Sequence, residues 1–221
     1  MNFDMKNYSV IGIKNEETKI FILDIHYAKR LPQIQYAFGL YDNNELVGVV
    51  TYGLPPSPDL CLLAGEENKD KVIELNRLVL KNNKKNEASF LVGNSLKMLP
   101  KPKIVISYAD VGQNHNGYIY QATNFKYSGL SKGGYLWVKK GVNGVYKHAR
   151  HTTLEKRLKN PELYERVERT HKHRYILVVG NKREKKDIYS KIKYPLDLPY
   201  PKGESKYYEN DTNIETQLLL M

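Results

Sequence analysis

The sequence predicts an α/β fold in which helices flank a central sheet. The main observation is the alternation of strand-like and helical segments between residues 72 and 138. Hydrophobic residues make up 41% of the chain, which is enough for a packed core and excludes wholesale disorder. The length of 221 residues favours one main domain with an appendage. The apolar runs are too short to span a bilayer and the first residues lack a signal-peptide pattern, so we expect a cytoplasmic protein.

The first part of the chain has the pattern of a strand, a helix and a hairpin. Tyr8–Ile13 is strand-like, and Asn15 is a suitable N-cap for a helix over Glu16–Ile25. Ile34–Tyr41 and Leu46–Tyr52 are rich in Val, Tyr and Phe and are separated by a turn sequence. These two runs therefore predict a β-hairpin.

The next part carries the strand–helix alternation. Val72–Leu80 is a strong strand candidate, and a helix with apolar residues at helical spacing begins after Asn86 and ends before Pro100. Lys103–Tyr108 is a nearly continuous apolar run, which is typical of a strand buried on both faces. A further helix and two strands are expected to follow, over Asn116–Thr123, Phe125–Gly129 and Tyr135–Val138.

The C-terminal part is strongly basic. The chain has a formal net charge of +11, and residues 147–193 contain 15 Lys or Arg but only 6 Asp or Glu. This density favours a polyanionic partner such as nucleic acid, and the alternative is a solvated surface without a partner. We expect helices and one strand in this region, followed by disorder over residues 203–221. The expected elements are helices over Thr152–Lys159, Pro161–Thr170 and Lys182–Lys191 and a strand over Tyr175–Val179.

Several common sites are excluded by their missing motifs. The chain has neither GxxxxGK[ST] nor a GxGxxG after a strand, which disfavours ATP-driven chemistry and a dinucleotide fold. Cys61 is the single cysteine, so no internal disulfide or thiolate metal cluster is possible. A GxSxG nucleophile elbow is also absent.

Two polar residues stand at positions that suit catalysis. Asp110 follows the buried strand, and ligands of α/β sheets gather at the carboxyl ends of strands. It can act as a base, a metal ligand or simply the cap of a turn. His26 follows an apolar helix and can exchange protons near neutral pH, bind a metal, or serve only to end the helix.

Tyrosine and amide side chains suggest a surface for a nucleic-acid base. Tyr120 can stack on a base or donate a proton, while the adjacent Gln121 can hydrogen-bond a base edge. In the run Glu74–Arg77, alternation places Glu74 and Asn76 on one face of the strand, which indicates that this face lines a cleft. The alternative is an edge strand with solvated polar residues.

Taken in order, four motifs resemble those of the Mom-type DNA modification proteins of bacteriophages, which belong to the acetyltransferase-like GNAT superfamily. The motifs are HYAKRLPQIQYAFGLYD…LVGVVTYG, ELNRLVL, ISYAD and GYIYQATNFKYSG. The similar stretch covers about residues 26–138. The resemblance implies a GNAT-like mixed central sheet flanked by helices. Residues 1–146 would form the catalytic domain and residues 147–202 a basic helical C-terminal extension.

The resemblance also implies an activity and its residues. Mom-type proteins convert adenine in phage DNA to the N6-carbamoylmethyl form, which protects it from restriction enzymes. The family's active-site groups match His26, Tyr27, Asp110 and Tyr120 here, and the family suggests iron, for which His26 and Asp110 are the candidate ligands. We expect the substrate to be held by Asn76, Arg77, Tyr118, Gln121 and Asn124, and the DNA phosphates by Lys29, Arg30, Lys182, Arg183, Lys185 and Lys186.

The chain departs from ordinary GNAT enzymes at one junction. Those enzymes bind the pyrophosphate of acetyl-CoA with a glycine-rich loop before a helix, but the corresponding residues 81–89 contain no glycine. Lys84 and Lys85 could hold a phosphate there, so the group donor is open between acetyl-CoA and an aminoacyl or other activated donor. Two alternative functions are a GNAT-like N-acyltransferase for a small molecule or protein, and a non-enzymatic DNA-binding protein. The last alternative predicts that His26, Asp110 and Tyr120 do not converge.

Overall fold

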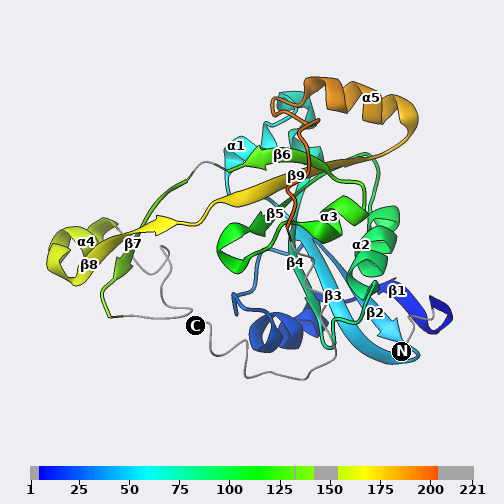
Figure 1. The fold of residues 1–221 in the computed structure, drawn as a ribbon, viewed down its shortest axis with the longest axis horizontal. Helices are drawn as coiled ribbons and strands as arrows, with labels where there is room; N and C mark the ends of the chain where they lie inside the picture. Colours follow the sequence, from blue (N-terminus) through cyan, green and yellow to red (C-terminus); the bar gives the residue numbers. More distant parts are fainter. Residues whose placement is uncertain (1–4, 132, 142–153, 204–221) are drawn as a thin grey trace.

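A computed structural model describes residues 5–131, 133–141 and 154–203 (Figure 1). Its centre is a seven-stranded sheet with strand order β1-β2-β3-β4-β5-β9-β6, and a separate two-stranded sheet pairs β7 with β8. Strands β4 and β5 are parallel, and the other neighbouring pairs are antiparallel. The predicted α/β class with a mixed sheet flanked by helices is confirmed.

The elements have the following bounds. The strands of the large sheet are β1 (Tyr8–Gly12), β2 (Tyr36–Asp42), β3 (Glu45–Gly53), β4 (Val72–Leu80), β5 (Lys103–Asp110), β9 (Lys172–Val179) and β6 (Lys126–Leu130). The small sheet contains β7 (Gly134–Lys139) and β8 (Tyr164–Arg169). The helices are α1 (Pro58–Cys61), α2 (Glu87–Met98), α3 (Tyr118–Ala122), α4 (Leu154–Lys159) and α5 (Lys182–Lys191). Short turns are η1 (Met5–Asn7), η2 (Asn15–Thr18), η3 (Phe21–Ile25), η4 (Glu66–Lys71), η5 (Val111–Gln113) and η8 (Pro161–Leu163).

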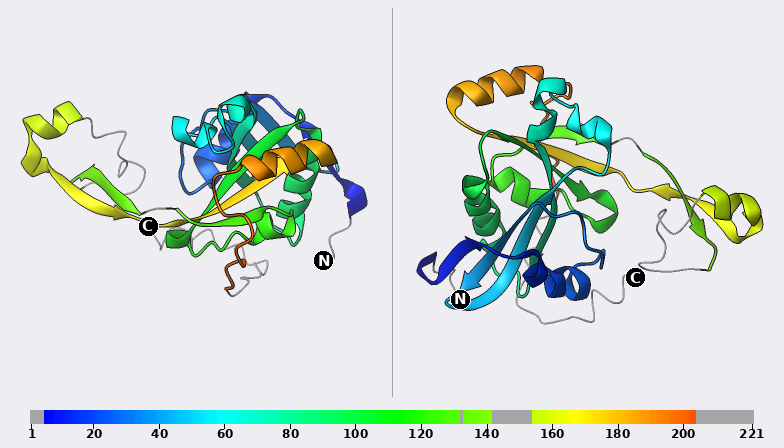
Figure 2. Two further views of the ribbon diagram at one scale, coloured as in Figure 1. Left: turned by 90° about the horizontal axis from the view of Figure 1, so that it is seen from above. Right: turned by 180° about the vertical axis from the view of Figure 1, so that it is seen from behind.

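Helices cover both faces of the large sheet (Figure 2). On one face, Leu91, Val92 and Leu96 of α2 pack with Ile119 and Tyr120 of α3 in one apolar cluster. On the other face, Ile188 of α5 packs with Val72, Ile104 and Val178. Burial of these apolar side chains is the main stabilising contribution to the fold.

The helix expected over Glu16–Ile25 forms in a modified way. It begins as the 3-10 turn η2 and ends as the π-helical turn η3. Phe21 and Ile22 of η3 are buried against Val49 and Val79 of the sheet. This packing fixes the chain segment that leads directly into His26.

The parallel strands β4 and β5 separate toward their carboxyl ends. They pair only over Val72–Glu74 and Ile104–Ile106, although both strands continue beyond these residues. Just past the paired region, the Ser107 hydroxyl donates to the Leu75 carbonyl at 3.0 Å. On the other side of β4, the register against β3 shifts at Asn76, which forms a bulge. We call the place where the pairing of β4 and β5 ends, just beyond Glu74, the opening between the two strands.

The basic C-terminal region differs from its prediction in two ways. The helix predicted over Pro161–Thr170 is wrong, because residues 164–169 form strand β8 paired with β7. Strand β9 is longer than predicted and lies inside the large sheet, between β5 and β6. Residues 172–191 are therefore part of the main α/β unit, although the sequence assigned them to an extension beyond residue 146.

The other predicted elements are present with small shifts at their ends. The helix predicted over Thr152–Lys159 is α4, whose expected first two residues lie outside the described part, as does the tail beyond residue 203. Within the described residues, no helix has the length and apolar character required to cross a membrane.

Candidate active site

The residues singled out as catalytic approach one another at the opening between β4 and β5. His26 and Tyr27 follow η3, Asp110 ends β5, and Tyr120 belongs to α3. The rings of His26 and Tyr27 stack with centroids 4.4 Å apart. These groups come from three separate parts of the chain.

Electrostatic effects show that the groups share one neighbourhood. Burial raises the pKa of Tyr27, and the negative charge of Asp110 raises it further. The pKa of Tyr120 is raised to about 12, mainly by burial and partly by Tyr27 and Glu74, while a hydrogen bond with Ser107 opposes the rise. Tyr27 therefore interacts electrostatically with both Asp110 and Tyr120. The catalytic roles of these residues stay predictions.

His26 is a neutral hydrogen-bond donor at pH 7. Its pKa is lowered to about 4, mainly by burial and partly by the positive charges of Arg77 and His115. The backbone N–H of Ala28 donates to Nδ1 of His26 at 3.0 Å, so the single proton of the neutral ring is on Nε2. Nε2–H can therefore donate to a substrate acceptor, whereas a ring with this pKa is a weak base at pH 7.

Asp110 caps the turn that follows its strand. Its Oδ1 accepts hydrogen bonds from the Gly112 N–H at 2.9 Å and from the Thr170 hydroxyl at 2.7 Å. Its Oδ2 lies 3.5 Å from the Nζ of Lys172. The structural role considered from the sequence is thus present, and it fixes the carboxylate at the edge of the opening.

Glu74 is the acidic residue that the sequence-based site left out. It lies on β4 where the pairing with β5 ends, and its Oε2 is buried without a hydrogen-bond partner among the described residues. Burial raises its pKa to about 7, against the opposing positive charges of Lys172 and Arg77. A carboxyl group with this pKa is suited to accept a proton at neutral pH. The alternation of polar residues in Glu74–Arg77 was the signal that could have found it.

The predicted substrate-binding residues divide into engaged and available groups. Asn76 accepts from Thr51 at 2.6 Å and donates to the Gln33 carbonyl at 2.9 Å. Gln121 donates to the Asn116 carbonyl at 3.1 Å and to the Tyr175 hydroxyl at 3.2 Å. Both amides therefore stabilise the fold instead of presenting free hydrogen-bonding edges.

Tyr118 and Asn124 keep polar surface available, whereas Arg77 is engaged and its Nη1 donates to the Asn76 carbonyl at 2.5 Å. The Nη2 of Arg77 donates to the Arg30 carbonyl at 2.9 Å, while its buried Nε has no hydrogen-bond partner among the described residues. Tyr118 is 67% exposed. Asn124 lies beyond α3 and lines a groove separate from the strand opening.

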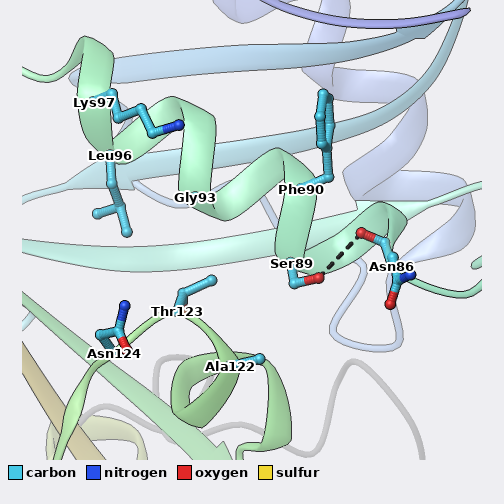
Figure 3. Close-up of a pocket in the computed structure, with 9 residues that line it drawn as sticks. All are labelled: Asn86, Ser89, Phe90, Gly93, Leu96, Lys97, Ala122, Thr123 and Asn124. Carbon is cyan, nitrogen blue, oxygen red and sulfur yellow. Dashed lines mark hydrogen bonds between the residues drawn. The ribbon is translucent and has the colours of Figure 1, made fainter. Parts of the chain in front are cut away.

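This groove, of about 490 Å³, runs between α2 and α3 (Figure 3). Phe90, Gly93 and Lys97 of α2 line one side, and Thr123 and Asn124 line the other. Tyr120 lies on the same short helix that leads into this second wall. Helix α3 therefore carries Tyr120 of the candidate active site and also leads into one wall of the groove.

The start of α2 does not fit a pyrophosphate. Buried Glu87 occupies the first turn, where its carboxylate accepts from the Lys84 backbone N–H at 2.8 Å and from the Tyr8 hydroxyl at 2.9 Å. Lys84 is itself paired with Asp42 at 3.1 Å. A carboxylate at a helix N-terminus uses the same positive potential that an anionic ligand would use. The donor phosphates expected at Lys84 would meet this negative charge.

The family model of the Mom protein family matches residues 7–202. This chain belongs to the Mom protein family. Among the curated proteins, the "Methylcarbamoylase mom" of Escherichia phage Mu is 28% identical over 192 residues, which cover 80% of this chain and 76% of that protein.

Solved acetyltransferase structures are similar to this Mom-family chain at low sequence identity. An N-acetyltransferase from Staphylococcus aureus Mu50 matches with a TM-score of 0.45 and 16% identity, over 78% of this chain and 98% of that one. Arabidopsis thaliana NAA60, solved in complex with acetyl-CoA, matches with a TM-score of 0.49 and 12% identity, over 78% and 98% of the two chains. The fold assignment rests on the strand order and register described above.

The residues present do not fit the iron site that resemblance to the Mom family suggested. Nowhere in residues 5–131, 133–141 and 154–203 do three or more His, Cys, Asp or Glu side chains form a group that could hold a metal. Both oxygens of Asp110 already face hydrogen-bond donors or Lys172. The proposed reaction therefore uses only side chains of the protein.

The predicted phosphate-binding residues lie in two places. Lys29 and Arg30 follow the His26–Tyr27 pair, and the Arg30 carbonyl accepts a hydrogen bond from Arg77 of β4. The basic residues of α5 lie on the helix that packs beside Val72 and Ile104, where β4 and β5 begin. Asp110 lies six residues farther along β5 than Ile104, or about 20 Å at the usual strand rise. Lys182, Arg183, Lys185 and Lys186 are therefore exposed at the end of the sheet opposite the site.

Proposed function

We propose that this protein transfers a carbamoylmethyl-type group to N6 of adenine in DNA and thereby protects phage DNA from restriction. Membership in the Mom family and the printed name of the phage Mu relative support this proposal. The observation that carries it is the group of His26, Tyr27, Glu74, Asp110 and Tyr120 around one opening.

The reaction requires the adenine to leave the duplex. N6 is a poor nucleophile because its lone pair is delocalised into the ring, and it is inaccessible to an enzyme within stacked DNA. Tyr27 is 51% exposed and interacts electrostatically with Tyr120, and these two rings are the proposed aromatic surface for a flipped base. His26 then donates from Nε2 to an acceptor on the base or the transferred group.

Glu74 is the proposed base. N6 forms a bond to the CH₂ carbon of the donor while the bond from that carbon to the leaving group breaks. One N6 proton passes to the Glu74 carboxylate, and the leaving group departs with the electron pair of the broken bond. The pKa of about 7, raised by burial, gives this carboxylate enough basicity to accept the proton.

The donor is proposed to lie in the groove between α2 and α3. Its polar lining of Asn86, Ser89, Lys97, Thr123 and Asn124 suits the amide end of a carbamoylmethyl donor, whose leaving group is attached to the CH₂ carbon. The Glu87 carboxylate at the start of α2 disfavours acetyl-CoA held there by its pyrophosphate. The same contact disfavours the alternative of a CoA-dependent N-acyltransferase for small molecules or proteins.

A restriction-protection assay tests the proposal. Plasmid DNA is prepared from cells expressing the wild-type protein or the Tyr27→Ala variant and is then digested with enzymes whose sites contain adenine. We expect resistance only with the wild-type protein, because the variant lacks one of the two stacking rings. Equal digestion of the two DNAs, with both proteins folded and equally abundant, contradicts the proposal.

A further inference from the structure

A two-stranded arm begins beside the candidate active site. We define the arm as β7, α4, η8 and β8, within residues 134–141 and 154–169. Figures 1 and 2 show it projecting from the body, with α4 at its far end. Thr170, immediately after β8, donates from its hydroxyl to Asp110 at 2.7 Å, and His171 accepts from the Val111 N–H at 3.1 Å. The base of the arm is therefore fixed to the turn that carries Asp110.

The strand register divides the arm into two different faces. Directly paired residues of antiparallel strands point to the same side, and alternate residues point to opposite sides. The pairs Tyr135↔Glu168, Trp137↔Arg166 and Lys139↔Tyr164 therefore share one face, and Glu168 is the acidic residue among them. The opposite face contains the apolar pair Leu136↔Val167 and the fully buried Val138. The first side, completed by Arg157 of α4, is the aromatic–basic face.

Two guanidinium groups stack on the aromatic rings of this face. Arg166 lies 3.8 Å from the Tyr135 ring centroid, and Arg157 lies 4.7 Å from that of Trp137. The rings remain accessible, with Tyr135 56% and Trp137 38% exposed. Within the described part of the chain, neither arginine forms an ion pair with a carboxylate. Stacking holds a guanidinium in place while its N–H groups stay available for phosphate oxygens.

The arm has the form of an element that binds a partner. A two-stranded sheet is only marginally stable by itself in water, and this one keeps its aromatic–basic face uncovered in the described structure. Its paired strands have the dimensions that the major groove of DNA admits. The three positive charges of Lys139, Arg157 and Arg166 exceed the single negative charge of Glu168 on this face, and the excess complements the DNA backbone.

We propose that the aromatic–basic face of the arm binds the DNA duplex next to the adenine that enters the site. This inference rests on the proposed function, since DNA is the substrate only there. The location of the arm beside Asp110 lets one duplex contact the arm and present a flipped base at the opening. The exposed lysines of α5 lie at the other end of the sheet and contribute less to this binding.

A pair of charge-matched variants tests the arm. The arm variant Lys139→Gln/Arg157→Gln/Arg166→Gln and the α5 variant Lys182→Gln/Arg183→Gln/Lys185→Gln each remove three positive charges. Binding to a fluorescent 25-base-pair duplex containing adenine is measured by anisotropy over a series of salt concentrations. We expect the arm variant to bind roughly 10- to 100-fold more weakly near 0.15 M salt and to lower the log–log salt slope by about 2 to 3. The α5 variant should stay within about threefold of the wild-type protein, since few phosphates reach it.

The possible outcomes separate the two proposals. If wild-type protein modifies and binds the duplex and the arm variant binds it equally well, the arm inference is wrong and the proposed function stands. An equal loss in both variants shows that binding follows net charge, which also overturns the arm inference. If wild-type protein neither binds nor modifies DNA, both proposals fail. Should the triple variant unfold, Arg157→Gln on the outer helix applies the same test, with an expected loss of about 3- to 10-fold.

Discussion

Glu74 shows how a single buried carboxyl group can combine a stability cost with reactivity. It sits where β4 leaves β5, and burial raises its pKa to about 7. For Glu74→Gln we expect adenine modification to fall by at least about 100-fold, the usual range for loss of a general base. Activity of the wild-type protein should fall as the pH decreases through about 7, because the base becomes protonated. Purified proteins assayed between pH 5.5 and 9 give both results, and wild-type activity in the variant removes Glu74 from the mechanism.

The same substitution makes an independent prediction for stability. Because the folded-state pKa of Glu74 lies above its unfolded value, its contribution is fully present below about pH 4.5 and is lost as the pH rises through about 7. Glu74→Gln should therefore gain stability relative to wild type at pH 9, by about 1–3 kcal/mol, but not at pH 5. Urea unfolding at the two pH values measures this difference. A pH-independent difference contradicts the burial of an ionisable Glu74.

Asp110 has a structural role that must be separated from any chemical one. In Asp110→Asn, the amide oxygen can still accept from the Gly112 N–H and the Thr170 hydroxyl, while the charge facing Lys172 is lost. We expect unfolding free energy within about 1 kcal/mol of wild type, and a fall in modification by orders of magnitude is expected only if Asp110 shares the proton transfer assigned to Glu74. Asp110→Ala, which also removes the cap, provides the comparison. Unchanged modified-nucleoside levels in Asp110→Asn would limit Asp110 to its capping role.

At the scale of elements, α2 depends on the carboxylate in its first turn. Glu87→Ala leaves the Tyr8 hydroxyl and the Lys84 N–H without this acceptor. We expect a loss of about 1–3 kcal/mol in unfolding free energy, the usual cost of an unsatisfied buried hydrogen-bonding group. Lys97→Ala, at an exposed position near the other end of α2, should change stability by less than about 0.5 kcal/mol. If the two variants unfold alike in urea, Glu87 does not stabilise the start of the helix.

The elements also show which features a sequence can predict. Local periodicity was sufficient for β4, α2 and β5, since their apolar residues recur at the strand or helix repeat. It failed for β8, where the dense charges of Tyr164–Arg169 suggested a solvated helix but the pairing partner β7 decides the conformation. The insertion of β9 between β5 and β6 is a non-local pairing that no local pattern contains.

In the candidate site too, some features could be predicted from the sequence and others depend on contacts between distant segments. His26, Tyr27, Asp110 and Tyr120 were selected by resemblance, together with the position of Asp110 at a strand end. The polar alternation of its strand pointed to Glu74. That its buried Oε2 has no hydrogen-bond partner among the described residues depends on where β4 and β5 stop pairing. The bulge at Asn76 also breaks the simple alternation, which is why Asn76 hydrogen-bonds Thr51 and Gln33.

At the scale of the whole molecule, β9 joins the basic C-terminal region to the core. Tyr175, Ile176 and Val178 are buried, and β9 connects β6 to the rest of the sheet. A chain ending at residue 146 should therefore lack cooperative thermal unfolding, because the cores on both sheet faces lose central side chains. Circular dichroism and calorimetry of this fragment beside the full chain test the prediction. A fragment that unfolds cooperatively near the full-length midpoint would show that residues 1–146 fold independently.

The central claim is that the opening between β4 and β5 modifies adenine in DNA. Its most direct test is mass spectrometry of nucleosides from plasmid DNA of cells expressing wild-type protein, Glu74→Gln or no protein. We predict a deoxyadenosine carrying a carbamoylmethyl group in the wild-type sample, at least about 100-fold less in Glu74→Gln, and none in the control. Unmodified deoxyadenosine in all three samples, with folded wild-type protein present in the cells, would contradict the account.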